Sequence, residues 1–258
     1  MNSPLRTMSS VTFRFYEELN DFLPRDRKKR DFVVPFRAQN SVKDMIESLG
    51  VPHTEVDLIL VNGESVDFSY IVRPGDRISV YPVFEALDVS GVTHLRPAPL
   101  RQTRFVLDTH LGKLARYLRL LGFDALYNNA YGDAELAEIS SSGDQRILLT
   151  RDHGLLKRKR ISHGYFIRED NPERQVREVL SRFDLRDAVE PFKRCTQCNG
   201  PIQSAGKEEV GEQLPGNVAR EFDEFSRCGT CGRVYWKGSH YDHMLKIIAG
   251  LLQEEMHR

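Results

Sequence analysis

The chain has 258 residues, of which 40% are hydrophobic, so it can bury the cores of two modest domains and is not a disordered tail. Its 37 basic and 37 acidic side chains give a formal net charge of +0, which argues against indiscriminate coating of nucleic acid by the whole molecule. The sequence has no apolar run long enough to span a membrane, and its beginning lacks the apolar core of a secretory signal peptide. We therefore expect a soluble, cytoplasmic protein with no membrane partner.

The first part of the chain has the pattern of a small α+β domain, which we place at residues 8–86. The strand-like runs VTFRFY and DFVVPFR precede a helix-like SVKDMIESLG, and further strand-like runs follow it. Asn62-Gly63 lies between two of these runs and predicts a hairpin turn. The segment 73–76 predicts another turn before the last strand, at Arg77–Tyr81.

This order, together with VNGESVD and RPGDRISVYP, resembles ubiquitin-like β-grasp proteins of the sulfur-carrier type. Sulfur carriers use a free C-terminal Gly-Gly, whereas this chain continues through FEALDVSGVTHLRPAPLRQT, which contains no such pair. We therefore expect a docking module instead of a carrier. Its partner stays open among RNA, another protein or the ribosome, and the rest of this chain. Residues 87–103 include prolines and fit an interdomain linker.

Strand and helix patterns alternate from residue 104 onward, in a domain that we place at residues 104–190. The apolar run 105–107 precedes apolar residues spaced as on a helix face, and GDAELAEIS gives a second helical pattern. The run 147–149 is too short for a buried helix and predicts an interior strand. This alternation predicts an α/β domain with a parallel sheet, in which ligands bind beyond the carboxyl ends of the strands.

Three acidic residues adjoin these elements. Asp108 follows the first strand, Asp133 opens the second helical pattern, and Asp152 closes RILLTRD. Carboxylates gathered at one sheet edge repel one another and need a cation, and Mg²⁺ or Mn²⁺ prefers such oxygen ligands. A metal held there activates water and stabilises charge on a phosphodiester. The alternative is that each Asp caps the helix that begins beside it, but their joint placement favours a metal site.

Two basic runs interrupt the balanced charge. Residues 25–30 lie in a predicted loop, and Lys157-Arg158-Lys159-Arg160 closely follows Asp152. Charge runs often form solvated surface, which is one interpretation of both. The second run is also placed to border the acidic site, and we then expect Lys157 and Arg158 to contact phosphates.

The chain has four cysteines in two pairs, Cys195-x₂-Cys198 and Cys228-x₂-Cys231, each beside turn residues. Paired turns of this kind present four thiolates to one tetrahedral Zn²⁺, and an all-thiolate set predicts a closed structural site. We therefore expect a zinc ribbon within residues 191–258, where zinc stabilises a lobe with little core. A disulfide interpretation is disfavoured by the expected reducing location. The insert SAGKEEVGEQLPGN between the pairs is expected to be a surface loop.

The chain closes with the helix-like LKIIAGLL, which we expect to pack on the preceding domain with Ser239 as its N-cap. Trp236 and Tyr241 are candidates for stacking on bases, and His240 and His243 for phosphate contacts. Such residues beside a helix start more often pack and cap.

The segments FVLDTHLGKLARYLRLLGFDALY, GDAELAEI and RILLTRDHGLL, with the paired CxxC and VYWKGSHYDHM, resemble the Mut-seven C-terminal RNase family over residues 101–252. The resemblance implies a PIN-like nuclease fold with a zinc ribbon and metal-dependent cleavage of RNA. It also implies that Asp108, Asp133 and Asp152 are the acidic ligands of the catalytic Mg²⁺ or Mn²⁺. A further acid often follows the third Asp in PIN-like proteins, whereas His153 follows Asp152 here.

Basic residues near the acids become candidates for substrate binding under this resemblance. They are Lys113, Arg116, Arg151, Lys157 and Arg158. Two functions remain open: a metal-dependent ribonuclease, and a noncatalytic RNA- or ribosome-associated adaptor in which the acids serve only as caps. The ribonuclease accounts for the acids, the basic run and the ribbon together, while the missing acid after Asp152 supports the adaptor.

Overall fold

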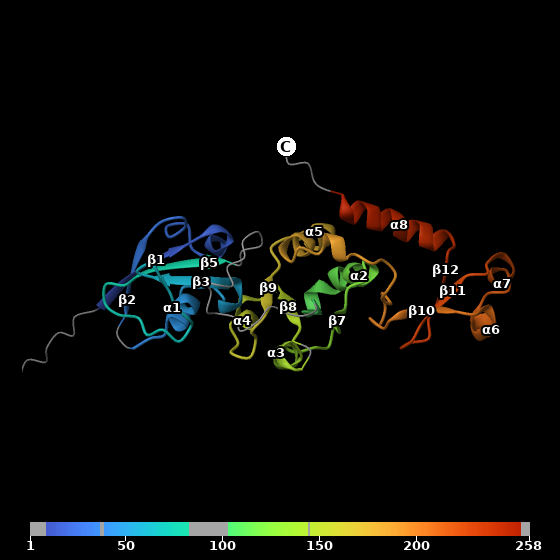
Figure 1. Ribbon diagram of the computed structural model, residues 1–258, viewed down its shortest axis with the longest axis horizontal. Helices are drawn as coiled ribbons and strands as arrows, with labels where there is room; N and C mark the ends of the chain where they lie inside the picture. The colour runs from blue at the N-terminus through green and yellow to red at the C-terminus, as the bar shows by residue number, and fades with distance from the viewer. Residues whose placement is uncertain (1–8, 37–38, 83–102, 144, 254–258) are drawn as a thin grey trace, which may run out of the picture. The chain divides into compact units, whose positions relative to one another are not determined.

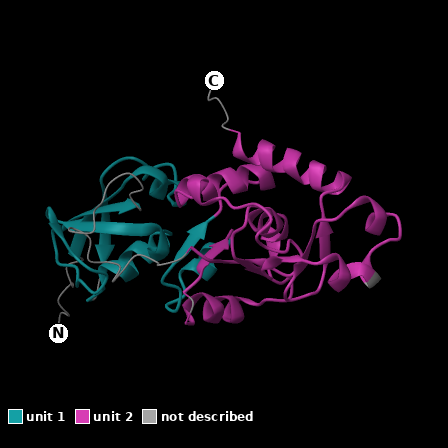
Figure 2. Cartoon of the chain, turned by 45° about the vertical axis from the view of Figure 1, so that its right-hand side comes forward, with its two compact units in different colours: residues 1–101, 152–166 teal, residues 102–151, 167–258 magenta. Residues whose placement is uncertain are grey.

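The computed structural model describes residues 9–36, 39–82, 103–143 and 145–253 (Figure 1). The chain divides into two compact units, which are considered separately below (Figure 2). Unit 1 comprises residues 1–101 and 152–166, and unit 2 comprises residues 102–151 and 167–258. The predicted linker, 87–103, lies outside the described residues except for Thr103. Within the described ranges, no helix is both long and apolar enough to cross a membrane.

Unit 1 contains a mixed sheet whose described strands have the order β2-β1-β5-β3-β4. β1 pairs in parallel with β5 at the centre, and the other neighbours are antiparallel. The strands are β1 (Ser9–Phe15), β2 (Phe32–Phe36), β3 (Val56–Val61), β4 (Glu64–Ser65) and β5 (Arg77–Pro82). The helices are η1 (Glu17–Phe22), α1 (Val42–Ser48) and η2 (His53–Glu55). This arrangement confirms the predicted α+β domain of β-grasp type.

Local sequence explains these elements of unit 1. β1 alternates between buried residues, Val11, Phe13 and Phe15, and less buried ones, as a strand with one face on a core must. Asn62 and Gly63 both have positive φ, of 53° and 95°, which matches the turn that joins two-residue hairpins. The predicted hairpin is therefore confirmed.

Residues 152–166 also belong to unit 1. They form the short helix α4 (His153–Leu156) and the strand β9 (Gly164–Phe166). Leu155, Leu156 and Ile161 are fully buried or nearly so. The segment is therefore held by buried apolar side chains, and the first of them, Leu155, lies three residues after Asp152.

Unit 2 begins with parallel strands in which β6 lies between β7 and β8. These elements are β6 (Phe105–Leu107), η3 (Thr109–Leu111), α2 (Gly112–Leu120), β7 (Ala125–Tyr127), α3 (Asp133–Ser141) and β8 (Ile147–Thr150). Every residue of β6 and β8 is buried, as expected for interior parallel strands. The predicted alternation of strands and helices, and the parallel sheet, are confirmed. Helix α5 (Pro172–Arg182) packs against α2, and η4 (Arg186–Ala188) follows it.

The cysteine pairs lie around a small antiparallel sheet, β10-β11-β12, formed by Ile202–Ala205, Phe225–Cys228 and Val234–Trp236. The insert was expected to be a loop, and this expectation is wrong in part. It contains α6 (Lys207–Val210) and η5 (Gly211–Gln213), and α7 (Val218–Glu221) follows it. Val210 and Val218 from this region pack with Phe225 of β11 in a separate small core. Burying these side chains explains why the polar insert folds.

The last helix, α8 (Ser239–Leu252), packs against α5 as predicted. The guanidinium of Arg177 in α5 donates a 3.2 Å hydrogen bond to the carbonyl of Gly250. The N-cap of α8 is Gly238, and Ser239 is the first helical residue, so the predicted cap was wrong by one position. Tyr241 stacks on Phe192 with 4.7 Å between ring centroids, which is a packing role for that ring.

Candidate metal centres

Asp108 lies directly after β6, where its backbone still belongs to the sheet. Its amide donates a 3.0 Å hydrogen bond to the carbonyl of Leu149 in β8. The residue is 9% exposed, and each carboxylate oxygen accepts a hydrogen bond of 2.6 Å. Oδ1 accepts from the Thr109 amide, and Oδ2 accepts from the Thr150 hydroxyl at the end of β8. The carboxylate is therefore fixed by two neighbouring strands.

This carboxylate suits an oxygen-preferring cation. An ionised carboxylate has about four lone-pair positions. Oδ1 accepts from the Thr109 amide and also, at 3.3 Å, from the Thr109 hydroxyl, whereas the Thr150 hydrogen bond leaves one position of Oδ2 for a cation. Sequence reasoning missed Thr150, although its place at the end of an apolar strand beside a predicted acid was a usable signal. Interactions with groups that orient a ligand are a regular feature of metal sites.

The other two acids have different surroundings. Asp133 is the exposed first residue of α3, behind the N-cap Gly132. Asp152 is exposed and is the N-cap of α4, where its Oδ1 accepts a 2.7 Å hydrogen bond from the Gly154 amide. Asp108 and Asp133 belong to unit 2 and Asp152 to unit 1. The capping interpretation thus describes one contact of Asp108 and one of Asp152, while the role of all three as metal ligands stays a prediction.

The basic candidates also differ from one another. Lys113 and Arg116 are exposed on α2. Arg151 pairs with Asp170 at 2.5 Å and donates to the carbonyls of residues 168 and 169, so it holds that loop. Lys157 is half-buried and its Nζ donates a 2.9 Å hydrogen bond to the Glu47 carbonyl. Arg158 is exposed. Phosphate binding by these five residues remains a prediction.

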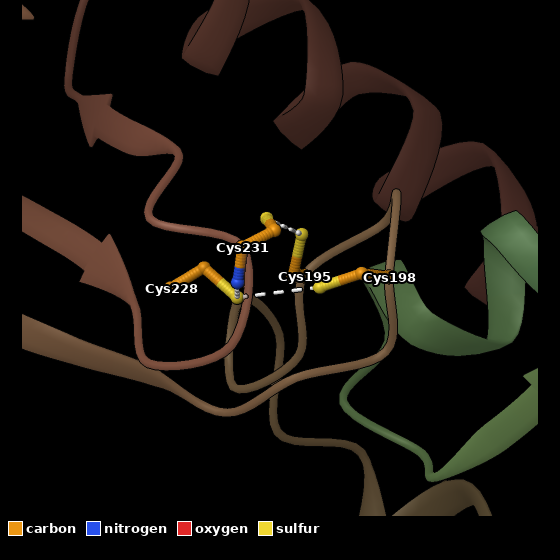
Figure 3. A group of neighbouring side chains, drawn as sticks. All are labelled: Cys195, Cys198, Cys228 and Cys231. Atoms are coloured by element: carbon orange, nitrogen blue, oxygen red, sulfur yellow. Dashed lines mark hydrogen bonds between the residues drawn. The ribbon is translucent and has the colours of Figure 1, made fainter.

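The four cysteines come together at one point (Figure 3). Their sulfur atoms all lie within 4.8 Å of one another, and two pairs are 3.7 and 3.4 Å apart. Sulfur atoms bound tetrahedrally to one zinc ion at about 2.3 Å are about 3.8 Å apart. Among the described residues, this is the one group of three or more candidate ligands gathered so closely. The quartet therefore forms a candidate zinc site.

A glycine permits the close approach of the two cysteine turns. A Cβ atom on Gly200 would lie 2.4 Å from the Thr230 hydroxyl and 2.8 Å from the Cys228 sulfur. The amides of Thr230 and Cys231 point at that sulfur, at 3.4 and 3.5 Å. The turns thus supply donors to the sulfur, as a thiolate requires.

Tyr235 on β12 adds a side-chain donor, with its hydroxyl 3.0 Å from the Cys195 sulfur. Burial acts to raise the pKa of the Cys195 thiol, but the hydrogen bonds from Tyr235 and the turn amides outweigh it and lower the pKa to about 6. Burial raises the pKa of the Cys198 thiol to about 12, with smaller contributions from its neighbouring thiols. Burial and the hydrogen bond to Cys195 also raise the pKa of Tyr235, which keeps its hydroxyl a donor. Sequence reasoning did not single out Tyr235.

A buried arginine connects the first cysteine turn with the parallel sheet. Arg119 of α2 is 4% exposed, and it donates to the carbonyls of Ala125, Thr196 and Gln197 at 2.8, 3.3 and 3.0 Å. Burial lowers the pKa of this guanidinium, and the nearby Cys195 and Cys198 oppose that effect. A single charged residue on an otherwise apolar helix face was the available signal for this contact.

Asn199, next to Cys198, makes the second connection. Its Oδ1 accepts a 3.0 Å hydrogen bond from the Ala125 amide, and its Nδ2 donates a 2.7 Å bond to Asp124. Asp124 forms a two-pronged pair with Arg146, at 2.7 and 3.2 Å. Burial acts to raise the pKa of Asp124, but the hydrogen bonds from Arg146 and Asn199 outweigh it, so the pKa is lowered. The ribbon is thus joined to β7 by buried polar contacts.

Comparison with known proteins agrees with this architecture. Residues 103–248 match the family described as the Mut7-C RNAse domain, and residues 8–88 match the Mut7-C ubiquitin family. No curated protein and no solved structure matches the chain. The first match covers more than half of the 258 residues and includes the parallel sheet, the carboxylates and the four-cysteine site. The chain therefore belongs to the Mut7-C RNAse domain family, with a Mut7-C ubiquitin-like domain before the region that matches this family.

Proposed function

We propose that the protein is a metal-dependent ribonuclease that hydrolyses RNA phosphodiester bonds. The observation that carries the proposal is the nearly buried carboxylate of Asp108, which follows the central parallel strand β6 and is fixed by Thr150. Membership of a family of RNase domains supports the nuclease class. Parallel sheets bind ligands beyond the carboxyl ends of their strands, which is where Asp108 lies.

Asp108, Asp133 and Asp152 are the proposed ligands of Mg²⁺ or Mn²⁺. When bound, the metal supplies Lewis-acid stabilisation of the charge that develops on the phosphate. Thr150 and the Thr109 amide hold the Asp108 carboxylate in one orientation, so its charge is in place before substrate arrives. Lys113 and Arg116 are exposed and are proposed to attract the RNA backbone in a sequence-independent way.

The zinc ion is proposed to be structural. Four thiolates fill a tetrahedral coordination sphere and leave no position for substrate. Arg119 and Asn199 tie the first cysteine turn to β7, so zinc binding is proposed to stabilise the nuclease region as well as the ribbon.

A noncatalytic RNA- or ribosome-associated adaptor is the second candidate. It is favoured by the hydrogen bonds that Asp108 and Asp152 make to the amides of Thr109 and Gly154, since capping alone accounts for those contacts. It predicts RNA or partner binding without cleavage.

Cleavage of end-labelled single-stranded and structured RNA in Mn²⁺, Mg²⁺ or EDTA tests the proposal. We expect cleavage by the wild type only with a divalent ion, and loss of cleavage in Asp108→Asn, Asp133→Asn and Asp152→Asn. The matched control is Asp187→Asn, which changes an exposed aspartate in η4 of unit 2. Absence of cleavage by zinc-loaded wild type in every metal, with RNA binding retained, would favour the adaptor.

A further inference from the structure

Unit 1 contains a strip of buried polar side chains at the start of β3. His53, Thr54, Glu55 and Asp57 are all at most 8% exposed, and Glu55 is fully buried. The other buried residues described in this β-grasp domain are apolar except for Asn20 and Asp76. Burying polar and charged groups is costly unless they are hydrogen-bonded. The strip therefore needs hydrogen-bond partners packed against it.

Partners for two members of this strip, Glu55 and His53, come from residues 152–166 of the same unit. The Phe166 amide donates a 2.6 Å hydrogen bond to Glu55 Oε1. His53 Nε2 lies 2.9 Å from the Ile161 carbonyl, while its Nδ1 lies 2.6 Å from Glu47 Oε1. Both ring nitrogens thus face acceptors, and the histidine bridges α1 to the segment.

Two further contacts extend the same surface. Lys157 Nζ donates a 2.9 Å hydrogen bond to the Glu47 carbonyl. Phe22 of η1 contacts the rings of His153 and Phe166 edge-on, with centroids 4.9 and 5.6 Å away. His153 and Phe166 are themselves 4.2 Å apart. The surface combines an aromatic cluster with directed hydrogen bonds, as specific interfaces do.

We propose that the ubiquitin-like domain is a docking module whose partner is this chain's own segment 153–166, and that its hold on this segment positions Asp152. The segment begins immediately after Asp152, which caps α4 through the Gly154 amide. Glu55 and Lys157 act as positioning residues, since they fix both ends of the segment. The docking stands on the contacts alone, whereas the effect on Asp152 rests on the proposed ribonuclease function.

The chemistry of the strip favours the chain's own segment over RNA as its partner. Glu55 and Asp57 are acidic, and Glu47 is bound to His53, so an RNA backbone would meet carboxylates at this face. The segment instead brings the Phe166 amide to Glu55 of the strip and the Lys157 ammonium to the neighbouring Glu47 carbonyl. In this proposal the Lys157 ammonium binds the Glu47 carbonyl and so takes part in the docking.

Hydrogen exchange of the full-length protein tests the docking. We expect Glu55→Ala to accelerate exchange of the Phe166 amide by at least about tenfold, because that amide loses its acceptor, while β1 and β5 amides keep their protection. Glu55→Gln retains an acceptor oxygen and should restore protection. Lys157→Met should accelerate exchange across α4. The controls are Glu64→Ala and Lys159→Met, both at exposed positions. Unchanged exchange in Glu55→Ala and Lys157→Met would overturn the docking.

Positioning of Asp152 is read separately, from the Mn²⁺ affinity and the kcat for RNA of the same variants. We expect both to fall in Glu55→Ala and to recover in Glu55→Gln. Faster exchange with unchanged Mn²⁺ affinity would overturn the positioning role. If the wild type cleaves no RNA, the proposed function fails, while the exchange data still decide the docking and the Mn²⁺ affinity still decides the positioning.

Discussion

The Thr150 hydroxyl donates a 2.6 Å hydrogen bond to Asp108 Oδ2, which joins the ends of the adjacent parallel strands β6 and β8. Thr150 is fully buried and Asp108 nearly so. A short hydrogen bond to an ionised acceptor is among the stronger ones in proteins. It fixes the rotamer of the carboxylate on which the proposed cation site depends.

Replacing Thr150 by valine tests the importance of this hydrogen bond. We expect Thr150→Val to lower Mn²⁺ affinity and RNA cleavage by about 10- to 100-fold, since the ligand loses its orienting partner. The free energy of unfolding should fall by about 1.5–3 kcal/mol because the hydrogen bond involves a charged group. Urea denaturation and cleavage assays measure the two effects. Thr150→Ser keeps the hydroxyl and should stay close to wild type; equal losses in both variants would contradict this role.

Removing the Tyr235 hydroxyl should weaken zinc binding. Tyr235→Phe removes the 3.0 Å hydrogen bond to Cys195, which raises the pKa of that thiol from about 6 toward its ordinary value. We expect a loss of about tenfold in zinc affinity, measured by competition with a chelator. Tyr241→Phe keeps its stack on Phe192 and serves as the control. Equal zinc affinity in wild type and Tyr235→Phe would rule the contact out as a determinant of zinc binding.

The Asp124–Arg146 pair should make stability depend on pH. The folded pKa of Asp124 is lowered, so its contribution is fully present above the unfolded pKa of about 3.9 and is lost as pH falls through the folded value. We expect Asp124→Asn to cost about 3 kcal/mol at pH 7, because Arg146 stays buried without its counter-charge. The difference in unfolding free energy between wild type and variant should shrink below about pH 4. A difference independent of pH would show that this charge pair does not stabilise the fold.

Weakening the small core around the insert should change the stability of the ribbon. Val210 is fully buried against Val218 and Phe225, and we expect Val210→Ala to cost about 2 kcal/mol of ribbon stability. Hydrogen exchange in β10 and β11 would report it, with zinc content unchanged. The control is Val33→Ala, at a valine that is 65% exposed. Unchanged hydrogen exchange of the β10 and β11 amides would mean that the insert is not part of the ribbon's core.

Sequence patterns predicted the elements whose signals are local. Alternation in β1, the Asn62-Gly63 turn, the apolar run 147–149 of β8 and the paired cysteines each carry a short-range signature, and each was confirmed. The helical insert was missed because Val210 and Val218 are far apart in a polar stretch and acquire a partner only when Phe225 folds beside them.

Contacts between distant residues were missed for the same physical reason. The charge of Arg119 on an apolar helix face signals a buried contact, but nothing near it in sequence identifies Thr196 and Gln197 as its acceptors. Likewise, nothing near Glu55 indicates the Phe166 amide. Thr150 lay only two residues from Asp152, but its partner is Asp108, which periodicity cannot identify. The metal-ligand role of the three aspartates remains a prediction.

Mn²⁺ binding to the zinc-loaded protein, followed by loss of the free-ion signal in electron paramagnetic resonance, tests the central claim without requiring the RNA target. The wild type and Asp187→Asn are expected to bind Mn²⁺ with equal affinity, while Asp108→Asn and Asp152→Asn lose binding by at least about tenfold and remain folded. Equal Mn²⁺ affinity in the wild type and Asp108→Asn would contradict the proposed cation site.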